Sequence, residues 1–324
     1  MVQLSIALDR YDRHFPFFDQ TVTPPNDIDL NIYQVGQTVV LRDGEFRHER
    51  MLDHREFDVC EFSLSSYLMA KDRGLDITAV PVFPRRLFSP GLFYVRDDAG
   101  INAPRDLVGR RVGVNSFQTT LSVLARGDLK SVYGVPWEEI TWCVVNAEKV
   151  AFEAKTSVVI ENLGTGADLG HAMADGRIDA FIHPHPPASV TGGQMRVRRL
   201  FADAHGEELR YYRKSGYFPI MHVMAMQSSL VDARPDMPLT VMDLFQQAKR
   251  ISRSYFDDPN WSQLAWGRKY FEDEEQLLAA DVWPMGLREN EKNLRDFIDY
   301  MLDQGLISRQ LTMDELFAAS TLGT

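Results

Sequence analysis

Short apolar runs and amphipathic stretches alternate along almost the whole chain. Runs that are apolar, or that alternate apolar with polar residues, predict strands at residues 4–8, 28–35, 57–59, 77–83, 91–95, 111–114, 140–145 and 179–183. Apolar residues spaced three or four apart predict helices, including residues 45–54, 167–175, 239–255 and 290–302. Residues 146–163 show no clear period. Because strands and helices alternate, we predict an α/β fold with parallel sheets covered by helices.

Two extended segments divide the predicted fold into two lobes. They are residues 83–91 and residues 183–190, and the second contains prolines at positions 184, 186 and 187. Prolines at that density form a rigid extended segment because they cannot donate to a strand ladder. We interpret the segments as crossings between the lobes. One lobe would comprise residues 1–90 and 225–324 and the other residues 91–224, with a ligand cleft between them.

The stretch from residue 57 to residue 86 joins a strand, a helix start crowded with hydroxyls and a second strand. Ser63, Ser65 and Ser66 stand at the helix start, where unpaired backbone amides attract anions. Arg85 and Arg86 follow the second strand, and guanidinium groups bind carboxylates through paired hydrogen bonds. The stretch therefore predicts a site for a small anion. The alternative is an ordinary strand–helix–strand unit with a capped helix and solvated arginines.

A second polar helix start follows the strand at residues 111–114. Asn115 and Ser116 suit a helix cap, and Gln118 and Thr119 lie in the first turn. Each lobe would then present a helix N-terminus to the shared cleft. That geometry suits a small anionic ligand held between two lobes.

Composition and charge limit the classes of molecule that the protein is expected to bind. The 324 residues are 44% hydrophobic and 25% charged, which is ordinary for a globular protein long enough for two lobes. The formal net charge of -11 argues against nucleic acid or an anionic membrane as a partner, so positive charge for an anionic ligand must be local. No stretch approaches the roughly 20 apolar residues of a membrane span, and residues 4–8 are too short for a signal-peptide core. We therefore expect a cytoplasmic protein, and its two cysteines fit a reducing compartment.

Other motifs predict neither a cofactor nor a metal site. His183 and His185 would share one face of an extended segment, as metal ligands can, but the flanking prolines favour a structural hinge. Gly164, Gly166 and Gly170 match neither nucleotide fingerprint, and no Gly-x-Ser-x-Gly elbow is present. We predict no cofactor and no metal ligand, and a metal requirement stays open.

Seven stretches combine into a more specific signal that covers almost the whole chain. They are Tyr-Asp-Arg at 11–13, Glu-Phe-Asp-Val and Ser-Leu-Ser-Ser-Tyr within 56–67, Val-Pro-Val-Phe-Pro at 80–84, Arg-Arg-Val-Gly-Val at 110–114, Phe-Pro-Ile-Met-His-Val at 218–223, Trp-Pro at 283–284 with Gly-Leu at 286–287, and Asp-Gln-Gly-Leu at 303–306. In this order they resemble the 4,5-dihydroxyphthalate decarboxylase family. The resemblance implies a type II periplasmic-binding-protein-like fold, in which two α/β lobes are joined by two hinge crossings. It also implies a cytoplasmic enzyme of aromatic catabolism that converts 4,5-dihydroxyphthalate to protocatechuate and CO2, and we expect a homo-oligomer.

Such a decarboxylation needs a cation for a carboxylate, a base near a ring hydroxyl and an acid near the ring carbon. When a hydroxyl para to the leaving carboxylate ionises, it pushes electrons to the carbon that bears the carboxylate. That carbon is protonated, and CO2 leaves as aromaticity returns. The resemblance implies that Arg13 and Arg86 are the cations that bind the substrate carboxylate. It also implies that the proton-transfer residues are His222, Asp12 and Glu61. Substrate contacts fall to Tyr11, Ser65, Ser66, Gln118, Thr119 and His185.

The sequence departs from the family pattern at several places. Ser116 replaces an acidic residue, Ser89 and Pro90 replace a basic pair, and His185 replaces an arginine. Residues 146–163 also differ from the family. A different aromatic acid as substrate is therefore one alternative, and a solute-binding protein for a small anion on the same fold is another, as is a synthase or isomerase. The lack of a signal-peptide core favours the enzyme over the binding protein.

Overall fold

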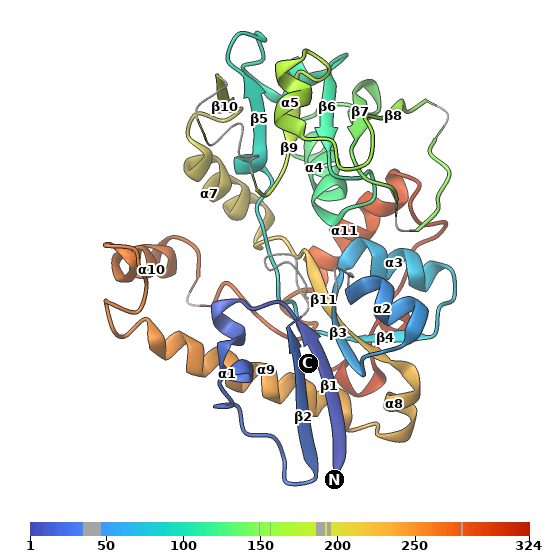
Figure 1. Cartoon of the computed structure of the whole chain (residues 1–324), viewed down its shortest axis with the longest axis vertical. Coiled ribbons are helices and arrows are strands. Elements are labelled where there is room, and N and C mark those ends of the chain that lie inside the picture. Colours follow the sequence, from blue (N-terminus) through green and yellow to red (C-terminus); the bar gives the residue numbers. More distant parts are fainter. Residues whose placement is uncertain (35–46, 149, 156, 186–191, 193–195, 280) are drawn as a thin grey trace.

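The computed structural model places one sheet in each of two lobes (Figure 1). It describes the chain apart from residues 35–46, 149, 156, 186–191, 193–195 and 280. The first sheet has the strand order β2-β1-β3-β11-β4, with β1 (Val2–Leu8), β2 (Ile28–Gln34), β3 (Val59–Ser63), β4 (Ile77–Val80) and β11 (His222–Gln227). β1, β2 and β3 are parallel, whereas β11 is antiparallel to both β3 and β4.

The second sheet has the strand order β10-β5-β9-β6-β7-β8. Its strands are β5 (Phe93–Arg96), β6 (Arg111–Val114), β7 (Thr141–Val144), β8 (Ile160–Asn162), β9 (Ala180–Ile182) and β10 (Val197–Arg199). β6 runs parallel to β7 and β9, and β5 runs antiparallel to β9 and β10. The predicted α/β fold with two lobes is confirmed, although each sheet also contains antiparallel pairs.

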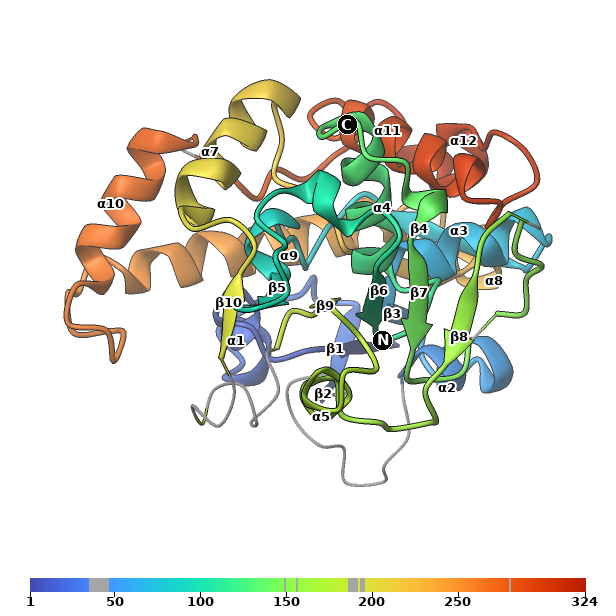
Figure 2. The same ribbon diagram turned by 90° about the horizontal axis from the view of Figure 1, so that it is seen from above.

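Helices cover the faces of both sheets (Figures 1 and 2). They are α1 (Phe15–Phe18), α2 (Arg47–His54), α3 (Leu64–Asp72), α4 (Thr120–Ser131), α5 (Leu169–Ala174), α7 (Ala204–Ser215), α8 (Ser228–Ala233), α9 (Met237–Tyr255), α10 (Gly267–Leu277), α11 (Glu291–Asp303) and α12 (Met313–Leu316). α9 buries Val241, Leu244 and Phe245 in a cluster with residues of the first sheet. Within the described part of the chain, no helix combines the length and the apolar character that crossing a membrane requires.

The two lobes pack against each other through α3, α4 and α11. Arg126 of α4 is fully buried and donates from Nε to Oε1 of Gln304 at 2.8 Å. At Gly127 a Cβ atom would collide with the ring of Tyr300, so glycine allows α4 and α11 to approach closely. One hydrophobic cluster includes Phe62 from the first sheet and Val112 from the second. The lobes therefore share part of their core.

The second crossing lies later in the chain than the sequence predicted. β10 pairs with β5, so the chain is still in the second sheet after residues 183–190, and that predicted crossing is wrong; residues 186–190 lie outside the described part. Proline density specifies an extended backbone, but not the lobe to which the chain continues. The chain returns after α7, and the predicted boundary at residue 225 falls inside β11. The crossings run side by side, since Leu87 N donates to Pro219 O at 3.0 Å and Met221 N to Arg85 O at 2.8 Å.

Candidate active site

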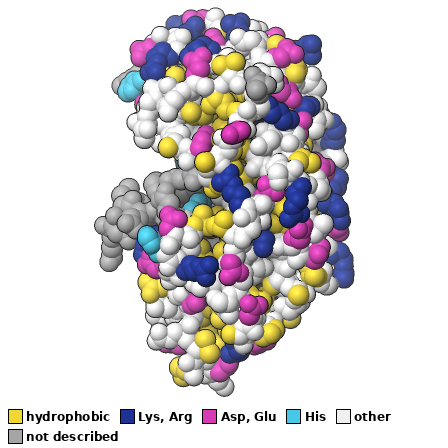
Figure 3. Space-filling view, turned by 90° about the vertical axis from the view of Figure 1, so that its right-hand side faces the viewer, with side chains coloured by type: hydrophobic (Ala, Val, Ile, Leu, Met, Phe, Trp, Pro, Cys, Tyr) yellow, Lys and Arg dark blue, Asp and Glu magenta, His cyan; other side chains and the backbone are white. Residues whose placement is uncertain are grey.

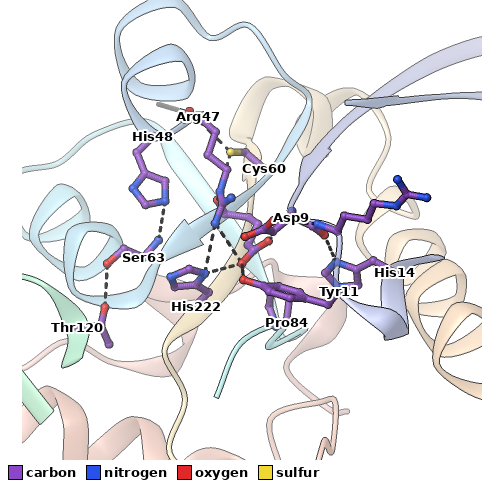
Figure 4. Close-up of polar contacts among 12 residues, drawn as sticks. Asp9, Tyr11, His14, Arg47, His48, Cys60, Ser63, Pro84, Thr120 and His222 are labelled. Carbon is purple, nitrogen blue, oxygen red and sulfur yellow. Dashed lines mark hydrogen bonds and ion pairs between the residues drawn. The ribbon is translucent and has the colours of Figure 1, made fainter. Parts of the chain in front are cut away.

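A buried carboxylate, Glu61, lies at the centre of a polar cluster in the first lobe. It belongs to β3, where every residue is buried, and its side chain is fully enclosed. Its Oε2 accepts the backbone N–H of Asp9 at 2.9 Å, and its Oε1 accepts the Tyr11 hydroxyl at 3.1 Å. Oε1 also lies 3.1 Å from Arg47 Nη2 and 2.5 Å from His222 Nδ1 (Figure 4). The predicted residues Tyr11, Glu61 and His222 therefore meet in the structure.

Strand register explains why Glu61 and His222 meet. β11 is antiparallel to β3, with Met224 opposite Glu61 and His222 opposite Ser63. Residues opposite each other, and residues two positions further along, lie on the same face of an antiparallel pair. Glu61 and His222 are therefore diagonal neighbours on one face of the first sheet. Asp9 follows the end of β1, the other neighbour of β3, and so reaches the same carboxylate.

The environment fixes the protonation state of each group in the pair. Burial alone would raise the pKa of Glu61, but the Arg47 charge and the hydrogen bond from His222 hold this pKa well below its usual value. Burial lowers the pKa of His222 to about 4, although Glu61 opposes the shift. At neutral pH the carboxylate is ionised and the imidazole is neutral.

The contacts also select the imidazole tautomer. An ionised carboxylate can only accept, so the hydrogen lies on His222 Nδ1 and is donated to Glu61. Arg47 Nη2 is 3.4 Å from the same nitrogen, a much weaker contact than the 2.5 Å to Glu61. Nε2 of His222 therefore carries a lone pair. A neutral imidazole held in this way is suited to accept a proton.

Sequence reasoning missed Arg47, which is the charge partner of Glu61. Arg47 opens α2, is buried, and donates from Nε to the backbone carbonyl of Glu61 at 2.7 Å. The pairing stabilises the charged form of Arg47 against the cost of burial. The sequence around α2 indicates a polar helix with Met51 turned inward, and no local pattern there marks Arg47 as different from its neighbours.

Tyr11, Asp12 and Arg13 lie together at the first turn after β1 but have different surroundings. Burial raises the pKa of Tyr11, so its phenol stays protonated and donates to Glu61. Arg13 stacks on the ring of Trp283 at 3.8 Å and donates from Nε to Pro84 O at 2.9 Å. Asp12 is 45% exposed and accepts the backbone N–H of Arg13 at 2.7 Å. Asp12 therefore lies at the edge of the cluster, where it forms a hydrogen bond and an ion pair with Arg13.

The two polar helix starts meet at the boundary between the lobes. Ser63 Oγ lies 2.8 Å from Thr120 Oγ1, and Ser65 Oγ donates to the backbone carbonyl of Gln118 at 2.6 Å. Thr119 Oγ1 lies 2.6 Å from Ser122 Oγ, and Ser66 is buried. The sequence correctly indicated that the two starts would face each other. Their described hydrogen bonds nevertheless join protein groups, and they hold the lobes together.

The protein's own carboxylate fills the anion position at the start of α4. Glu148 accepts the backbone N–H groups of Phe117 at 2.6 Å and of Gln118 at 3.0 Å. The Gln118 side chain pairs with the backbone of Val150, donating at 3.1 Å and accepting at 3.0 Å. Glu148 therefore occupies these amides and lies in the stretch that had no assignable period, and the substrate contacts expected of Gln118 and Thr119 stay predictions.

Arg86 lies in the hinge and binds protein acceptors. It is buried and donates from Nη1 to Phe218 O at 2.7 Å, and from Nη2 to Asn290 Oδ1 at 2.6 Å and to Pro284 O at 3.0 Å. These contacts tie both crossings to the segment that precedes α11. The geometry gives no support to the predicted role of Arg86 as a substrate clamp.

The side chain of the neighbouring Arg85 points to the opposite side of the backbone from that of Arg86. Arg86 bridges to Ile220 across the hinge, and successive residues of extended backbone point to opposite sides. The carbonyl of Arg85 accepts the N–H of His222 at 3.2 Å, which places Arg85 beside the start of β11. Burial lowers the pKa of His222, and the charge of Arg85 lowers it further. Arg85 is thus a cation next to the proposed proton acceptor.

His183 and His185 approach the same region from the second lobe. Burial lowers the pKa of both, and the charge of Arg85 lowers both further. His185 N donates to His183 Nδ1 at 3.0 Å, so the pair forms a local turn. Among the described residues, no group of three or more metal-ligating side chains is found.

Figure 3 shows that the surface is hollowed between the lobes in this view of the molecule.

Comparisons with known proteins place the chain in a family. The chain is 32% identical over 332 residues to a 4,5-dihydroxyphthalate decarboxylase of Comamonas testosteroni, with 99% of this chain and 98% of the relative covered. A protein of the same name from Pseudomonas putida is 33% identical over 223 residues, covering 67% of this chain and 83% of the relative. The family model described as NMT1/THI5 like matches residues 40–185.

A solved structure agrees on the fold. The chain is similar to the periplasmic aliphatic sulphonate binding protein SsuA from Escherichia coli, with a TM-score of 0.60, 14% identity and full coverage of both chains. This likeness confirms the predicted periplasmic-binding-protein-like fold, and at that identity it concerns the fold alone. The full-length similarity in sequence carries the assignment further: the chain belongs to the 4,5-dihydroxyphthalate decarboxylase family.

Proposed function

We propose that the protein is a carboxy-lyase that removes one carboxylate from a hydroxylated aromatic dicarboxylate. The named relatives make 4,5-dihydroxyphthalate the first substrate to test, with protocatechuate and CO2 as products. The observation that carries the proposal is the buried pair in which ionised Glu61 holds neutral His222 through Nδ1. Such a pair supplies a base of fixed orientation, which this chemistry requires.

In the proposed reaction, the lone pair on His222 Nε2 accepts the first proton. His222 accepts the proton of the hydroxyl para to the leaving carboxylate, and the oxygen electrons move into the ring. The ring carbon that bears the carboxylate takes a second proton, which the solvent supplies. The bond from that carbon to the carboxylate then breaks, its electrons restore the aromatic ring, and the phenolate regains its proton from His222. One proton is consumed for each CO2 released, because hydrogen replaces the carboxylate.

Arg85 supports the recognition of a dianionic substrate. The net charge of the chain is -11, so an aromatic dicarboxylate needs a local cation. Arg85 lies beside His222. Burial raises the pKa of Tyr11 in the first lobe and lowers the pKa of His185 in the second lobe, and the charge of Arg85 acts to lower both. A carboxylate that binds Arg85 would bring the ring between the two lobes and toward His222.

A direct assay tests the proposed reaction. Purified protein is incubated with 4,5-dihydroxyphthalate and with related hydroxybenzoates and phthalates, each with and without chelator. Release of CO2 and uptake of protons are followed, and the aromatic product is identified by chromatography. Equal amounts of CO2 and protocatechuate would support the proposal. Tight binding without turnover of any compound would instead favour a solute-binding protein.

The variant His222→Asn connects the activity to the site. Loss of a general base reduces rates by about 10²- to 10⁴-fold, so a decrease in this range is expected in kcat. His171→Asn is the matched control, because the His171 side chain is 72% exposed on α5. If His222→Asn retained full activity in a correctly folded protein, the assignment of the base would be wrong even if the chain is a decarboxylase.

A further inference from the structure

Helix α10 stands at the outer edge of the molecule, where both ribbon views place it away from the sheets (Figures 1 and 2). Its inner side is anchored to the end of α9. The rings of Phe256 and Phe271 stack at 4.9 Å, and Arg268 Nη1 donates to Phe256 O at 2.8 Å. α10 is thus a fixed element with one side turned away from the rest of the protein.

The outward side of α10 carries large apolar residues at helical spacing. Trp266 is 66% exposed, Tyr270 53% and Leu277 38%. Positions separated by four and eleven residues fall on one side of a helix, so these three side chains share a single face. Leu264, just before the helix, is also exposed. A cluster of this kind on one face is typical of an interaction surface rather than of a solvated helix.

The charges of α10 run in the direction opposite to the one that a lone helix favours. Arg268 and Lys269 lie in the first turn, and four acidic residues follow at positions 272–275. The helix dipole favours acidic residues at the N-terminal end and basic residues at the C-terminal end. An antiparallel neighbour with the same sequence would place the basic start of each helix beside the acidic half of the other. The charge pattern of α10 is therefore complementary to itself.

We propose that α10 pairs with α10 of a second copy of the chain, antiparallel and about a twofold axis. In this arrangement Trp266 of each copy packs near Leu277 of the other, Tyr270 lies near the axis, and Lys269 faces Asp273 of the other copy. Every contact occurs twice, as a twofold interface requires. An 11-residue helix is only about 16 Å long, so we expect a reversible dimer that dissociates on dilution. This proposal is independent of the catalytic one.

Charge exchange on the full chain tests the pairing. Sedimentation velocity over a range of protein concentrations should show a dimer for the wild type and a larger fraction of monomer after dilution. Lys269→Glu or Asp273→Lys alone places like charges opposite each other, and each should weaken dimerisation by at least about tenfold. The double variant restores opposite charges and should recover most of the wild-type affinity. An equimolar mixture of the two single variants should also pair, because every contact between copies then joins opposite charges, whereas positions 269 and 273 within each helix carry like charges. Recovery in the mixture distinguishes pairing of α10 with another copy from an effect within one helix.

The apolar contact has its own variant and control. Trp266→Ala should weaken dimerisation by about tenfold or more, because it removes the largest exposed ring of the face. Leu239→Ala is the control, since Leu239 is another exposed apolar residue, at the other end of the α9 segment. Circular dichroism confirms that each variant is folded. A wild type that stays monomeric at every concentration, or a dimer that neither the charge nor the Trp266 variants weaken, would overturn the proposal.

Discussion

Glu61 and His222 face each other across neighbouring antiparallel strands, with Glu61 Oε1 2.5 Å from His222 Nδ1. They lie far apart in the sequence, and the pairing of β11 with β3 brings them together. Arg47 and the backbone N–H of Asp9 bind the same carboxylate, so the group that orients the histidine is itself held at several points. The network sets both the charge of the pair and the nitrogen that faces away from it.

Replacing Glu61 with glutamine should disable the histidine without removing it. The new side-chain amide could donate to Nδ1 of His222, which would move the imidazole hydrogen to Nε2 and remove the lone pair needed for proton transfer. We expect Glu61→Gln to reduce kcat by about 10²- to 10⁴-fold. It should also lower the free energy of unfolding by about 3–5 kcal/mol, because Arg47 would remain buried without its charge partner. Steady-state kinetics and urea denaturation measure the two effects.

Glu289→Gln is the matched control for this change, because Glu289 is an exposed glutamate. It should leave both kcat and the unfolding free energy near their wild-type values. A folded Glu61→Gln protein with wild-type kcat would show that the carboxylate does not set the tautomer of His222.

The paired arginines should separate into one substrate residue and one structural residue. Arg85→Gln should raise KM for a dicarboxylate by about 10- to 100-fold, since a charge-assisted contact contributes about 1.5–3 kcal/mol. Arg86→Gln should instead lower the unfolding free energy by about 3 kcal/mol, because one buried and two partly buried acceptors lose their donor. Kinetics and thermal unfolding on both variants provide the test. If Arg86→Gln raised KM and Arg85→Gln lowered only the unfolding free energy, Arg86 would be the residue that binds the substrate carboxylate.

Sequence patterns predicted the elements that carry the site better than the contacts within it. The strand pattern at residues 57–59 marks a real strand, and the resemblance to a family indicated Glu61 and His222 as proton-transfer residues. Their meeting depends on the order of strands in the sheet. Periodicity within a strand gives no information about that order, which only the structure shows.

The residues that sequence analysis missed act over long distances along the chain. Glu148 binds amides about 30 positions earlier and lies in a loop without periodicity. Arg47 reaches Glu61 from a helix of ordinary polar composition. The second crossing was misplaced because proline fixes the backbone conformation, whereas the pairing of β10 with β5 decides where the chain goes. Such features depend on tertiary contacts, which leave no local pattern.

Removing the carboxylate of Glu148 should expose an anion site at the start of α4. Glu148→Ala leaves the amides of Phe117 and Gln118 without their acceptor, and we expect a loss of about 1–2 kcal/mol in unfolding free energy. Added sulfate or acetate should restore part of this loss in the variant more than in the wild type, because the amides can bind a free anion. Thermal unfolding with sodium sulfate and with sodium chloride at equal ionic strength measures the difference. Equal responses of both proteins would contradict this account.

The buried carboxyl of Asp128 should make stability depend on pH near neutrality. Burial raises its pKa to about 7, and it accepts hydrogen bonds from Ser89 Oγ at 2.6 Å and Tyr211 OH at 3.1 Å. Because this pKa exceeds the unfolded value, the folded protein binds more protons between about pH 4 and pH 7, and stability falls as pH rises through that window. Asp128→Asn keeps an acceptor without the charge. It should therefore raise the unfolding free energy at pH 8, by an amount on the order of 4 kcal/mol at most, and have little effect at pH 4. Urea denaturation at both pH values tests this, and a variant that is less stable than the wild type at pH 8 would show that Asp128 is needed in its charged form.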